Sequence, residues 1–491
     1  MSYHYPPGPS TRLPWVHVRQ FRRDRLDYLS RLQRDYGDAV SLTLGGRSIV
    51  LFTQPRIIRK LLVDHAGNFT IREAFGGARS LFDDQLGMRP RLLRRSFGRF
   101  CCGCNRQDGL LTIDGQDHHD QRRLAQPLFT KQRLAGYADE MAAQTLRTID
   151  GWQAGTSVDL VEELHGLALR TVARVLFGLD LARGSDVERA FNRVVNFSTR
   201  PRSGLRGLAP SRTAADGMGY EDAWKVLERT AEELIAARRR DPAGSTDVVS
   251  ALLAARLPDG TPLTDHQIRQ HALVLLGTGH TTIWSALSWT LCLVSQHPEV
   301  SAHIRAELDD VLGGRAPSTG DLARLQYVEM VVKESLRLYP PIWATVRRAQ
   351  DDFEVEGYRL PGDSLVLFSQ WVTHRLPELY PDPMRFLPER FAADQNEPPP
   401  PFAYFPFGTG IRSCIGGGYA MVQLKVSVAT ILQRFAPRLV PGHPVEPHAR
   451  DAVVLPRYGL PMILGAAREP SPVPRRGHVA SDTGVSATRR E

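Results

Sequence analysis

One cysteine stands among glycines near the C-terminal end of the chain, in the sequence FGTGIRSCIG at residues 407–416. The glycines permit tight turns and positive φ angles on both sides of the sulfur. A long helical run follows, from Gly417 to Phe435, so Cys414 is expected at the N-terminus of a helix. There the helix dipole and the free backbone N–H groups favour thiolate over thiol. Cys414 is therefore a candidate nucleophile or metal ligand, and the alternative is a buried structural cysteine.

The spacing of this loop resembles the haem-binding signature F-x-x-G-x-R-x-C-x-G of the cytochrome P450 superfamily. Its five fixed positions are matched by Phe407, Gly410, Arg412, Cys414 and Gly416. The resemblance implies heme b (iron-protoporphyrin IX) as the cofactor, with Cys414 as the proximal iron ligand that promotes O–O cleavage. It also implies that Phe407 shields the sulfur and that Arg412 pairs with a haem propionate.

Three further basic residues match positions that contact haem propionates in this family. His118 and Arg122 lie four residues apart, so a helix would present both on one face. Their spacing alone is equally compatible with a surface helix of mixed charge. Arg347, in the sequence RRA at 347–349, matches an R-x-A position of the family and is the third candidate.

The sequence GTGHTT at residues 277–282 interrupts the apolar pattern of a long predicted helix. A glycine pair beside threonines can kink a helix and open its carbonyl groups to water. The segment resembles the family's oxygen-binding sequence A/G-G-x-D/E-T-T/S, in which Gly279 matches the glycine and Thr282 the key threonine. Thr281 stands in place of the usual acid, which implies altered proton delivery. These three residues are the catalytic candidates, and Thr278 is a candidate for the substrate pocket.

Glu334 and Arg337 are spaced so that both lie on one face of a predicted helix. An isolated pair of this kind says little, because exposed ion pairs contribute little to stability. The pair matches the family's ExxR sequence, and Arg390 in the sequence PERF matches the third member of a structural Glu–Arg–Arg network. After this helix, the resemblance places four more residues at the substrate pocket near the haem: Ile342, Trp343, Ala344 and Thr345.

The hydrophobic periodicity predicts a mainly helical fold with a small β-sheet region, and the resemblance specifies the cytochrome P450 (haem-thiolate) fold. Helices are expected over residues 22–36, 55–65, much of 138–260, and 264–296, where Thr264 and Gln267 form a capping box. Residues 40–44 and 48–52 alternate as a hairpin. A single catalytic domain is expected over residues 15–465, between a proline-rich segment at 1–14 and a disordered tail at 466–491.

Two stretches have no regular pattern. Residues 75–108 are expected to form either a loop over the haem or a disordered insertion, and residues 200–217 a flexible break. Cys101, Cys102 and Cys104 lie in the first stretch without a matching second pair of metal ligands, and we interpret them as incidental thiols.

The composition excludes several classes of protein. The net charge is +9, but no nucleic-acid-binding motif accompanies it, so a basic surface or a docking face for an acidic electron-transfer protein is expected. No apolar signal-peptide segment opens the chain, which favours a cytoplasmic protein. Residues 272–294 carry no acidic or basic side chain other than a histidine and are long enough to span a bilayer. Their threonines and glycines favour a buried central helix, so no membrane span is expected.

The resemblance implies a monooxygenase that activates O2 on haem iron and hydroxylates or epoxidises an apolar small molecule. Arginine fills nearly every basic position, which is typical of a GC-rich bacterial genome. We expect a role in bacterial secondary metabolism, with a terpenoid, polyketide or similar substrate. The chain has no G-x-G-x-x-G segment for a fused nicotinamide or flavin module. Electrons are therefore expected from a separate ferredoxin or flavodoxin and its NAD(P)H-dependent reductase.

Three alternatives to this function stay open. The enzyme could be driven by peroxide, it could couple or rearrange its substrate by radical chemistry, or the chain could be a non-catalytic haem-binding sensor. Thr282 argues against the sensor, because a bystander haem needs no oxygen-handling threonine.

Overall fold

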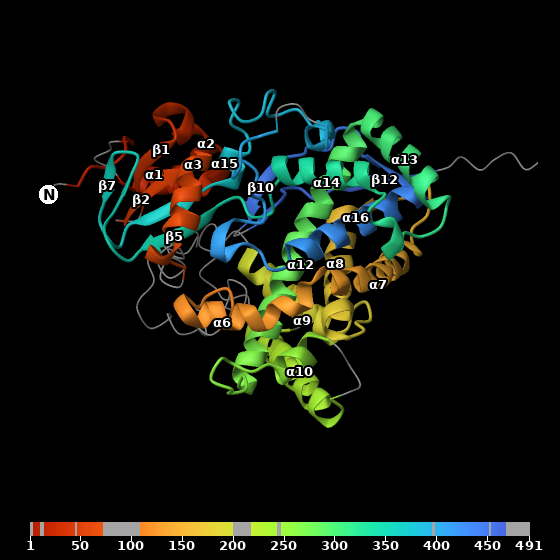
Figure 1. The fold of residues 1–491 in the computed structure, drawn as a ribbon. Helices are drawn as coiled ribbons and strands as arrows, with labels where there is room; N and C mark the ends of the chain where they lie inside the picture. The colour runs from red at the N-terminus through yellow and green to blue at the C-terminus, as the bar shows by residue number, and fades with distance from the viewer. Residues whose placement is uncertain are drawn as a thin grey trace, which may run out of the picture.

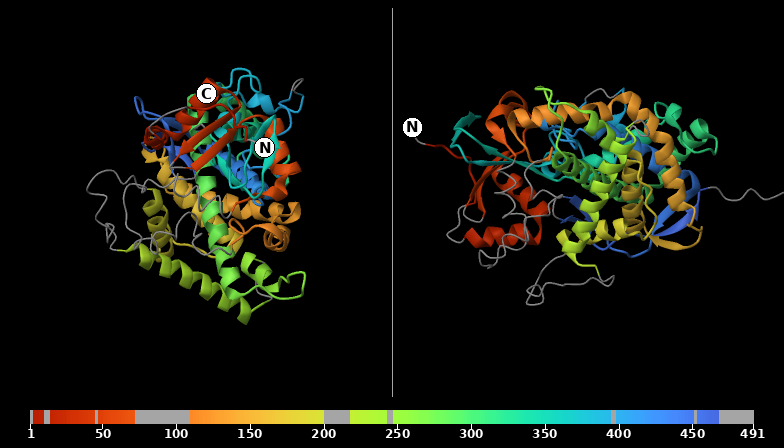
Figure 2. Two further views of the ribbon diagram at one scale, coloured as in Figure 1. Left: turned by 90° about the vertical axis from the view of Figure 1, so that its left-hand side faces the viewer. Right: turned by 90° about the horizontal axis from the view of Figure 1, so that it is seen from below.

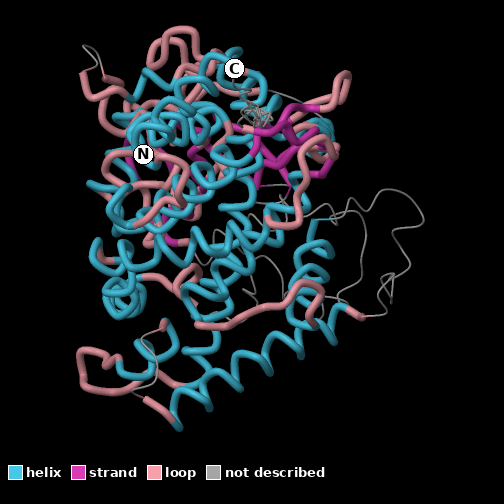
Figure 3. The backbone as a smooth tube through the Cα atoms, turned by 90° about the vertical axis from the view of Figure 1, so that its right-hand side faces the viewer, coloured by secondary structure: helices cyan, strands magenta, loops and turns pink. Residues whose placement is uncertain are grey.

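The structure is a computed structural model that describes residues 3–9, 14–44, 47–71, 109–199, 218–242, 247–394, 398–450 and 453–467. Most of these residues are helical, as predicted, and the strands are confined to small sheets (Figure 3). A strand-rich part with helices α1 to α3 lies on the left of Figure 1, and the long helices form the rest of the molecule. The expectations for residues 75–108, with their three cysteines, and for 200–217 concern residues outside this description.

Helix α12, Asp265–Gln296, passes through the middle of the molecule (Figure 1). The predicted capping box begins it: the Thr264 hydroxyl accepts from the Gln267 N–H at 3.2 Å, and the Gln267 side-chain oxygen accepts from the Thr264 N–H at 2.9 Å. The backbone stays helical through residues 277–282, so the expected glycine kink does not interrupt the helix. Every residue from Ile283 to Val294 is buried, which agrees with a central helix. None of the described helices is long and apolar enough to cross a membrane.

Four long helices pack against α12 and build the site around it. They are α8 (Leu160–Phe177), α10 (Tyr220–Arg240), α14 (Gln326–Leu338) and α16 (Gly417–Arg434). Helix α10 lies at the end of the molecule away from the five-stranded sheet (Figure 2). The other α-helices after residue 109 in the described part of the chain are α6 (Gly115–Ala125), α7 (Lys131–Ile149), α9 (Asp186–Thr199), α11 (Val248–Ala254), α13 (Pro298–Leu312) and α15 (Gln370–Thr373).

The predicted helix at residues 22–36 is divided in two. Helix α1, Pro14–Arg23, ends before Asp24, and α2, Arg25–Tyr36, begins after it. The Asp24 carboxylate accepts hydrogen bonds from the N–H groups of Leu26 and Asp27, and this N-cap starts a new helix that periodicity alone does not separate from the first. The predicted helix at 55–65 is α3, Pro55–Arg59, continued by a wider π-helical turn at Lys60–Asp64.

The predicted hairpin is confirmed and forms the edge of a five-stranded sheet in the order β1-β2-β8-β5-β3. Strand β1 is Ala39–Leu44, β2 Arg47–Phe52, β8 Leu365–Phe368, β5 Thr345–Ala349 and β3 Phe69–Thr70. A three-stranded sheet contains β4 (Ser157–Asp159), β12 (Pro461–Ala466) and β9 (Phe435–Leu439), and two pairs contain β6 (Phe353–Val355) with β7 (Tyr358–Leu360) and β10 (Pro447–Arg450) with β11 (Val453–Pro456). Strands β5 and β3 bring distant parts of the chain to the candidate site.

Described residues on either side of the expected domain, 15–465, contact its strands and helices, and the boundaries themselves stay a prediction. His4 exchanges backbone hydrogen bonds with Arg359 of β7, and the Ser41 N–H of β1 donates to the Pro7 carbonyl, so residues 3–9 pack on the strands. At the other end, Ala466 completes β12 and the Ala467 N–H donates to the Arg434 carbonyl. Residues 468–491, most of the expected tail, lie outside the description.

Candidate functional site

The cysteine loop is closed by the backbone hydrogen bond from the Cys414 N–H to the Phe407 carbonyl, at 2.8 Å. Gly408 and Gly410 have φ angles of 67° and 69°. A Cβ atom at Gly410 would lie 2.0 Å from the Leu62 carbonyl oxygen, so only glycine fits there. The loop leads directly into α16, with Gly416 as its N-cap. The structure therefore places Cys414 at the mouth of a helix, as the sequence predicts.

The position of Cys414 at a helix N-terminus was expected to favour the thiolate, but its surroundings favour the thiol. The residue is accessible to solvent, yet protein atoms surround its sulfur on most sides. Burial raises the pKa of the Cys414 thiol, and the Gly416 N–H and the Arg122 charge oppose this rise only in part. The helix mouth alone therefore does not produce a thiolate. A coordinated metal cation would, because it deprotonates a thiol outright.

The basic candidates gather beside this loop. His118 and Arg122 lie on α6, Arg347 on β5 and Arg412 in the loop, and their charges influence one another. The Arg122 guanidinium donates to the Ser413 hydroxyl at 3.4 Å. His118 is 5% exposed, and burial followed by the neighbouring Arg412 and Arg122 charges lowers its pKa to about 4, so its ring is neutral near pH 7.

This cluster fits a group that carries two carboxylates. Among the described residues, neither Arg122 nor Arg347 forms an ion pair with a carboxylate. Arg347 is 7% exposed, and burial lowers the pKa of its guanidinium to about 10, with the Arg412 charge adding to the effect. Buried cations without partners are costly, so the cluster is suited to receive anionic groups such as haem propionates.

The threonines of α12 all bond to the preceding turn of their own helix. The hydroxyl of Thr278 donates to the Val274 carbonyl at 2.7 Å, and that of Thr281 donates to Gly277 at 3.1 Å. Residues 276–279, 281 and 282 are partly exposed in the middle of a helix that is buried on either side of them. They are therefore the part of this central helix that the packing of its neighbours leaves partly uncovered. The structure gives no contact between these threonines and Cys414, so their catalytic role stays a prediction.

Gly279 lies against α8, and His280 packs against side chains of α8 and α9. A Cβ atom at Gly279 would lie 2.9 Å from Val172 of α8, so this glycine permits close packing of the two helices. The His280 ring is completely buried, packs against His165 and Phe191, and bonds the His165 carbonyl at 3.2 Å through Nε2. His280 therefore does not replace the acid that is missing at Thr281.

The four predicted pocket residues after α14 divide into two groups. Trp343 is 2% exposed and its ring packs against Phe21 of α1, which differs from the expected pocket position. Its side chain is therefore part of the core. Ile342, Ala344 and Thr345 are partly exposed, and their place in the pocket stays a prediction.

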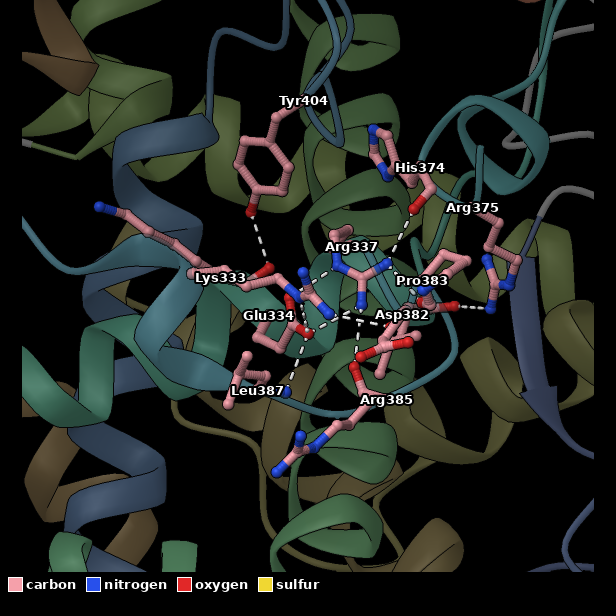
Figure 4. A network of polar contacts seen from close by, with 12 residues as sticks. Lys333, Glu334, Arg337, His374, Arg375, Asp382, Pro383, Arg385, Leu387 and Tyr404 are labelled. Atoms are coloured by element: carbon pink, nitrogen blue, oxygen red, sulfur yellow. Dashed lines mark hydrogen bonds and ion pairs between the residues drawn. The ribbon is translucent and has the colours of Figure 1, made fainter. Parts of the chain in front are cut away.

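Glu334, Arg337 and Arg390 form the predicted network, and Figure 4 shows the Glu334 and Arg337 side chains at its centre. The Arg337 guanidinium donates two hydrogen bonds of 2.7 Å to Glu334, and both side chains are 0% exposed. The Arg390 guanidinium donates a hydrogen bond to the Glu334 carboxylate at 3.3 Å, and the Leu387 N–H donates to the same carboxylate at 3.0 Å. The Arg337 side chain also donates to the carbonyls of His374, Pro383 and Arg385. The network therefore joins α14 to the long loop before the cysteine and has no free group for catalysis.

One residue of the site was not predicted from the sequence. Asp114 lies immediately before α6, and its carboxylate forms an ion pair with Arg412. The Arg412 guanidinium also donates to the Ile113 carbonyl. In the sequence, an aspartate directly before a predicted helix indicates an N-cap. It does not indicate an ion pair with Arg412 in the cysteine loop, about 300 residues further along the chain.

Comparison with known proteins agrees with this geometry. The cytochrome P450 family model matches residues 95–462. Pentalenene oxygenase from Streptomyces avermitilis is 32% identical over 443 residues, which cover 90% of this chain and 93% of that protein. Cyclooctatin synthase from Streptomyces melanosporofaciens is 32% identical over 88% of this chain and 89% of its own length.

Solved structures share the fold. The retinoic acid-bound cyanobacterial CYP120A1 superposes with a TM-score of 0.77 at 25% identity, over 95% of this chain and 100% of that one. The cytochrome P450DA heme domain has a TM-score of 0.78 at 22% identity, over 95% and 99% of the two chains. The chain therefore belongs to the cytochrome P450 family and is a haem-iron monooxygenase with the helix-rich fold of that family.

Proposed function

We propose that this monooxygenase inserts one oxygen atom of O2 into a terpenoid of bacterial secondary metabolism, with heme b bound through Cys414. The observation that carries the haem site is the position of Cys414 beside a cluster of three arginines and a neutral histidine, two of whose arginines lack a carboxylate partner among the described residues. Cys414 would hold the iron, and Arg122, Arg347, Arg412 and His118 would hold the two propionates. Phe407, whose ring lies against the start of α16, would cover the sulfur.

The haem, when bound, supplies the site at which O2 is reduced and one oxygen atom is transferred. The overall reaction consumes a substrate C–H bond, O2, two electrons and two protons, and yields an alcohol and water. The residues of α12 must then deliver protons while water is kept from the substrate. Thr282 is the candidate on this helix that matches the family's key threonine, and its hydroxyl retains two lone pairs that can accept a hydrogen bond from a water molecule or from the substrate.

The substrate class is supported by the relatives. Pentalenene oxygenase, cyclooctatin synthase and cyclooctat-9-en-7-ol 5-monooxygenase are each 32% identical to this chain over 87% of its length or more. Their names describe an oxygenase of pentalenene, a synthase of cyclooctatin and a 5-monooxygenase of cyclooctat-9-en-7-ol. A terpenoid hydrocarbon or a terpenoid already carrying one hydroxyl group is therefore the substrate that we propose. The electrons would come from a separate ferredoxin or flavodoxin and its NAD(P)H-dependent reductase.

The test begins with the haem. The reduced protein with CO should show the red-shifted Soret band of thiolate ligation, and Cys414→Ser should lose it. Cys292→Ser is the matched control, because Cys292 is the other cysteine in the described part of the chain and is buried within α12. The band should survive in that control. A Cys414→Ser protein that keeps the thiolate band would refute the assignment of Cys414.

The second test follows the oxygen atom. A library of terpene hydrocarbons and alcohols is incubated with the enzyme, a ferredoxin system and ¹⁸O2, and products are analysed by mass spectrometry. Incorporation of one ¹⁸O atom per product supports monooxygenation. Products formed at full rate from peroxide alone, or without any label, would favour the peroxide-driven or rearranging alternatives instead.

A further inference from the structure

Asp114 occupies the N-cap position of α6, but its carboxylate does not accept from the first N–H groups of that helix. It accepts instead from the Ile71 N–H, at 3.0 Å and 3.1 Å to its two oxygens, and from the Arg412 guanidinium. The side chains of Asp114 and Arg412 are 19% and 11% exposed. The pair is therefore largely shielded from water and stronger than an ordinary surface ion pair.

These contacts join three segments of the chain. Ile71 directly follows β3, Asp114 begins α6, and Arg412 lies two residues before Cys414 in the loop. The Arg412 guanidinium is held from one side by the Asp114 carboxylate and the Ile113 carbonyl. Two anchors of this kind fix the direction of a planar guanidinium far better than one.

Asp114 also affects the net charge of the basic cluster. Arg122, Arg347 and Arg412 are positive, and His118 is neutral because of burial. The negative charge of the Asp114 carboxylate acts on His118, Arg347 and Arg412 alike, and it raises the pKa of each of these groups. Three guanidinium groups and one carboxylate leave two positive charges, which equals the charge of two ionised propionates. Without Asp114, the cluster would hold one positive charge in excess.

We propose that Asp114 is a positioning residue for the haem site, which orients Arg412 toward the propionates and balances the charge of the arginine cluster. This inference rests on the proposed haem site at Cys414. Its consequence concerns the iron: a negative charge nearby stabilises the oxidised, more positive state of a redox centre, so removing that charge favours reduction. A residue that only held the fold together would not have this effect.

The test compares the reduction potential of the haem-loaded protein in four forms: wild type, Asp114→Asn, Asp114→Glu and Asp117→Asn. The first variant removes the charge, the second keeps it, and the third removes a charge from an exposed position on the same helix. We expect the equilibrium constant for reduction to rise roughly tenfold in Asp114→Asn, which corresponds to about 1.4 kcal/mol. We expect little change in Asp114→Glu and in Asp117→Asn, whose charge faces water and is screened by salt.

Each outcome decides the proposal. Equal potentials in the wild type and Asp114→Asn would overturn it, as would an equal shift in Asp117→Asn, because the effect would then be one of net charge alone. If Asp114→Asn fails to retain haem, normal loading of Asp114→Glu supports a requirement for charge, and failure of both variants overturns the proposal in favour of packing. The CO spectrum of the same wild-type sample tests the Cys414 assignment separately, so failure of the haem site and failure of the Asp114 proposal are distinguishable.

Discussion

The hydroxyl of Thr282 donates a hydrogen bond of 2.9 Å to the carbonyl oxygen of Thr278, one turn earlier in α12. The proton of this hydroxyl is therefore engaged within the helix, and its oxygen is left as an acceptor. Thr278 and Thr282 lie on one face because they are four residues apart. This arrangement suits a residue that receives a hydrogen bond at the reaction site and passes a proton along a chain, whereas it cannot serve as an acid by itself.

Thr282→Ala should uncouple electron consumption from product formation. Removal of the acceptor interrupts proton delivery, and a positioned proton relay contributes about 10²–10⁴-fold to a rate. We expect less product per electron consumed and more hydrogen peroxide, measured with the true substrate and a reductase system. Thr282→Ser keeps the hydroxyl and should retain most of the coupling. Unchanged coupling and rate in Thr282→Ala would count against proton delivery through this residue.

Glu334→Ala should prevent the accumulation of folded, haem-loaded protein. The change leaves the fully buried Arg337 guanidinium without its carboxylate, a loss of about 3–5 kcal/mol. Lys333→Ala is the matched control on the same helix, since Lys333 pairs with Glu329 and the two side chains are 35% and 36% exposed. That pair should contribute only about 0–1 kcal/mol. The measurement is soluble haem-loaded yield and denaturant unfolding. A well-folded Glu334→Ala enzyme with only a slower chemical step would contradict the structural role.

His280→Phe should make the protein less sensitive to acid. Burial, followed by the neighbouring His165, lowers the pKa of His280 well below its ordinary value. Below about pH 6.5 the unfolded chain binds a proton at this position that the folded protein does not, so the free energy of unfolding falls as the pH falls. A phenylalanine fills the same space between His165, Phe191 and Trp284 without this penalty.

The measurement for His280 is the melting temperature between pH 7 and pH 5. The decrease on acidification should be smaller in His280→Phe than in the wild type. Phe191→Leu, which alters the packing around His280 without removing a titratable group, should keep the wild-type slope. Identical slopes in all three proteins would show that His280 does not contribute to acid sensitivity.

Turnover supported by a ferredoxin should weaken as salt is added. The chain carries a net charge of +9, and an acidic partner would be attracted to it over distances comparable with the Debye length. That length shortens from about 10 Å at 0.1 M salt to about 3 Å at 1 M. Reduction by dithionite, which needs no protein docking, is the control for direct effects of salt. Salt-independent turnover, with electron transfer shown to limit the rate, would argue against electrostatic docking.

Features of this protein whose residues lie close together in the chain could be predicted from the sequence alone. The glycines and the cysteine of residues 407–416 lie in one loop, the capping box at Thr264 starts α12, and Glu334 and Arg337 share one helical face. In each case the relevant residues are neighbours along the chain. Turn geometry and helix periodicity are then sufficient to predict their arrangement.

Contacts between residues that are far apart in the chain became known only from the tertiary structure. Asp114 pairs with Arg412 across 298 positions, Gly279 packs on Val172 rather than opening the helix, and Trp343 turns toward Phe21. The pKa of Cys414 likewise depends on burial more than on its helix, and burial is not readable from a local pattern. Helix and strand propensities fix each element separately, but the packing of elements from distant parts of the chain selects which side chain faces the core, the haem site or a partner charge.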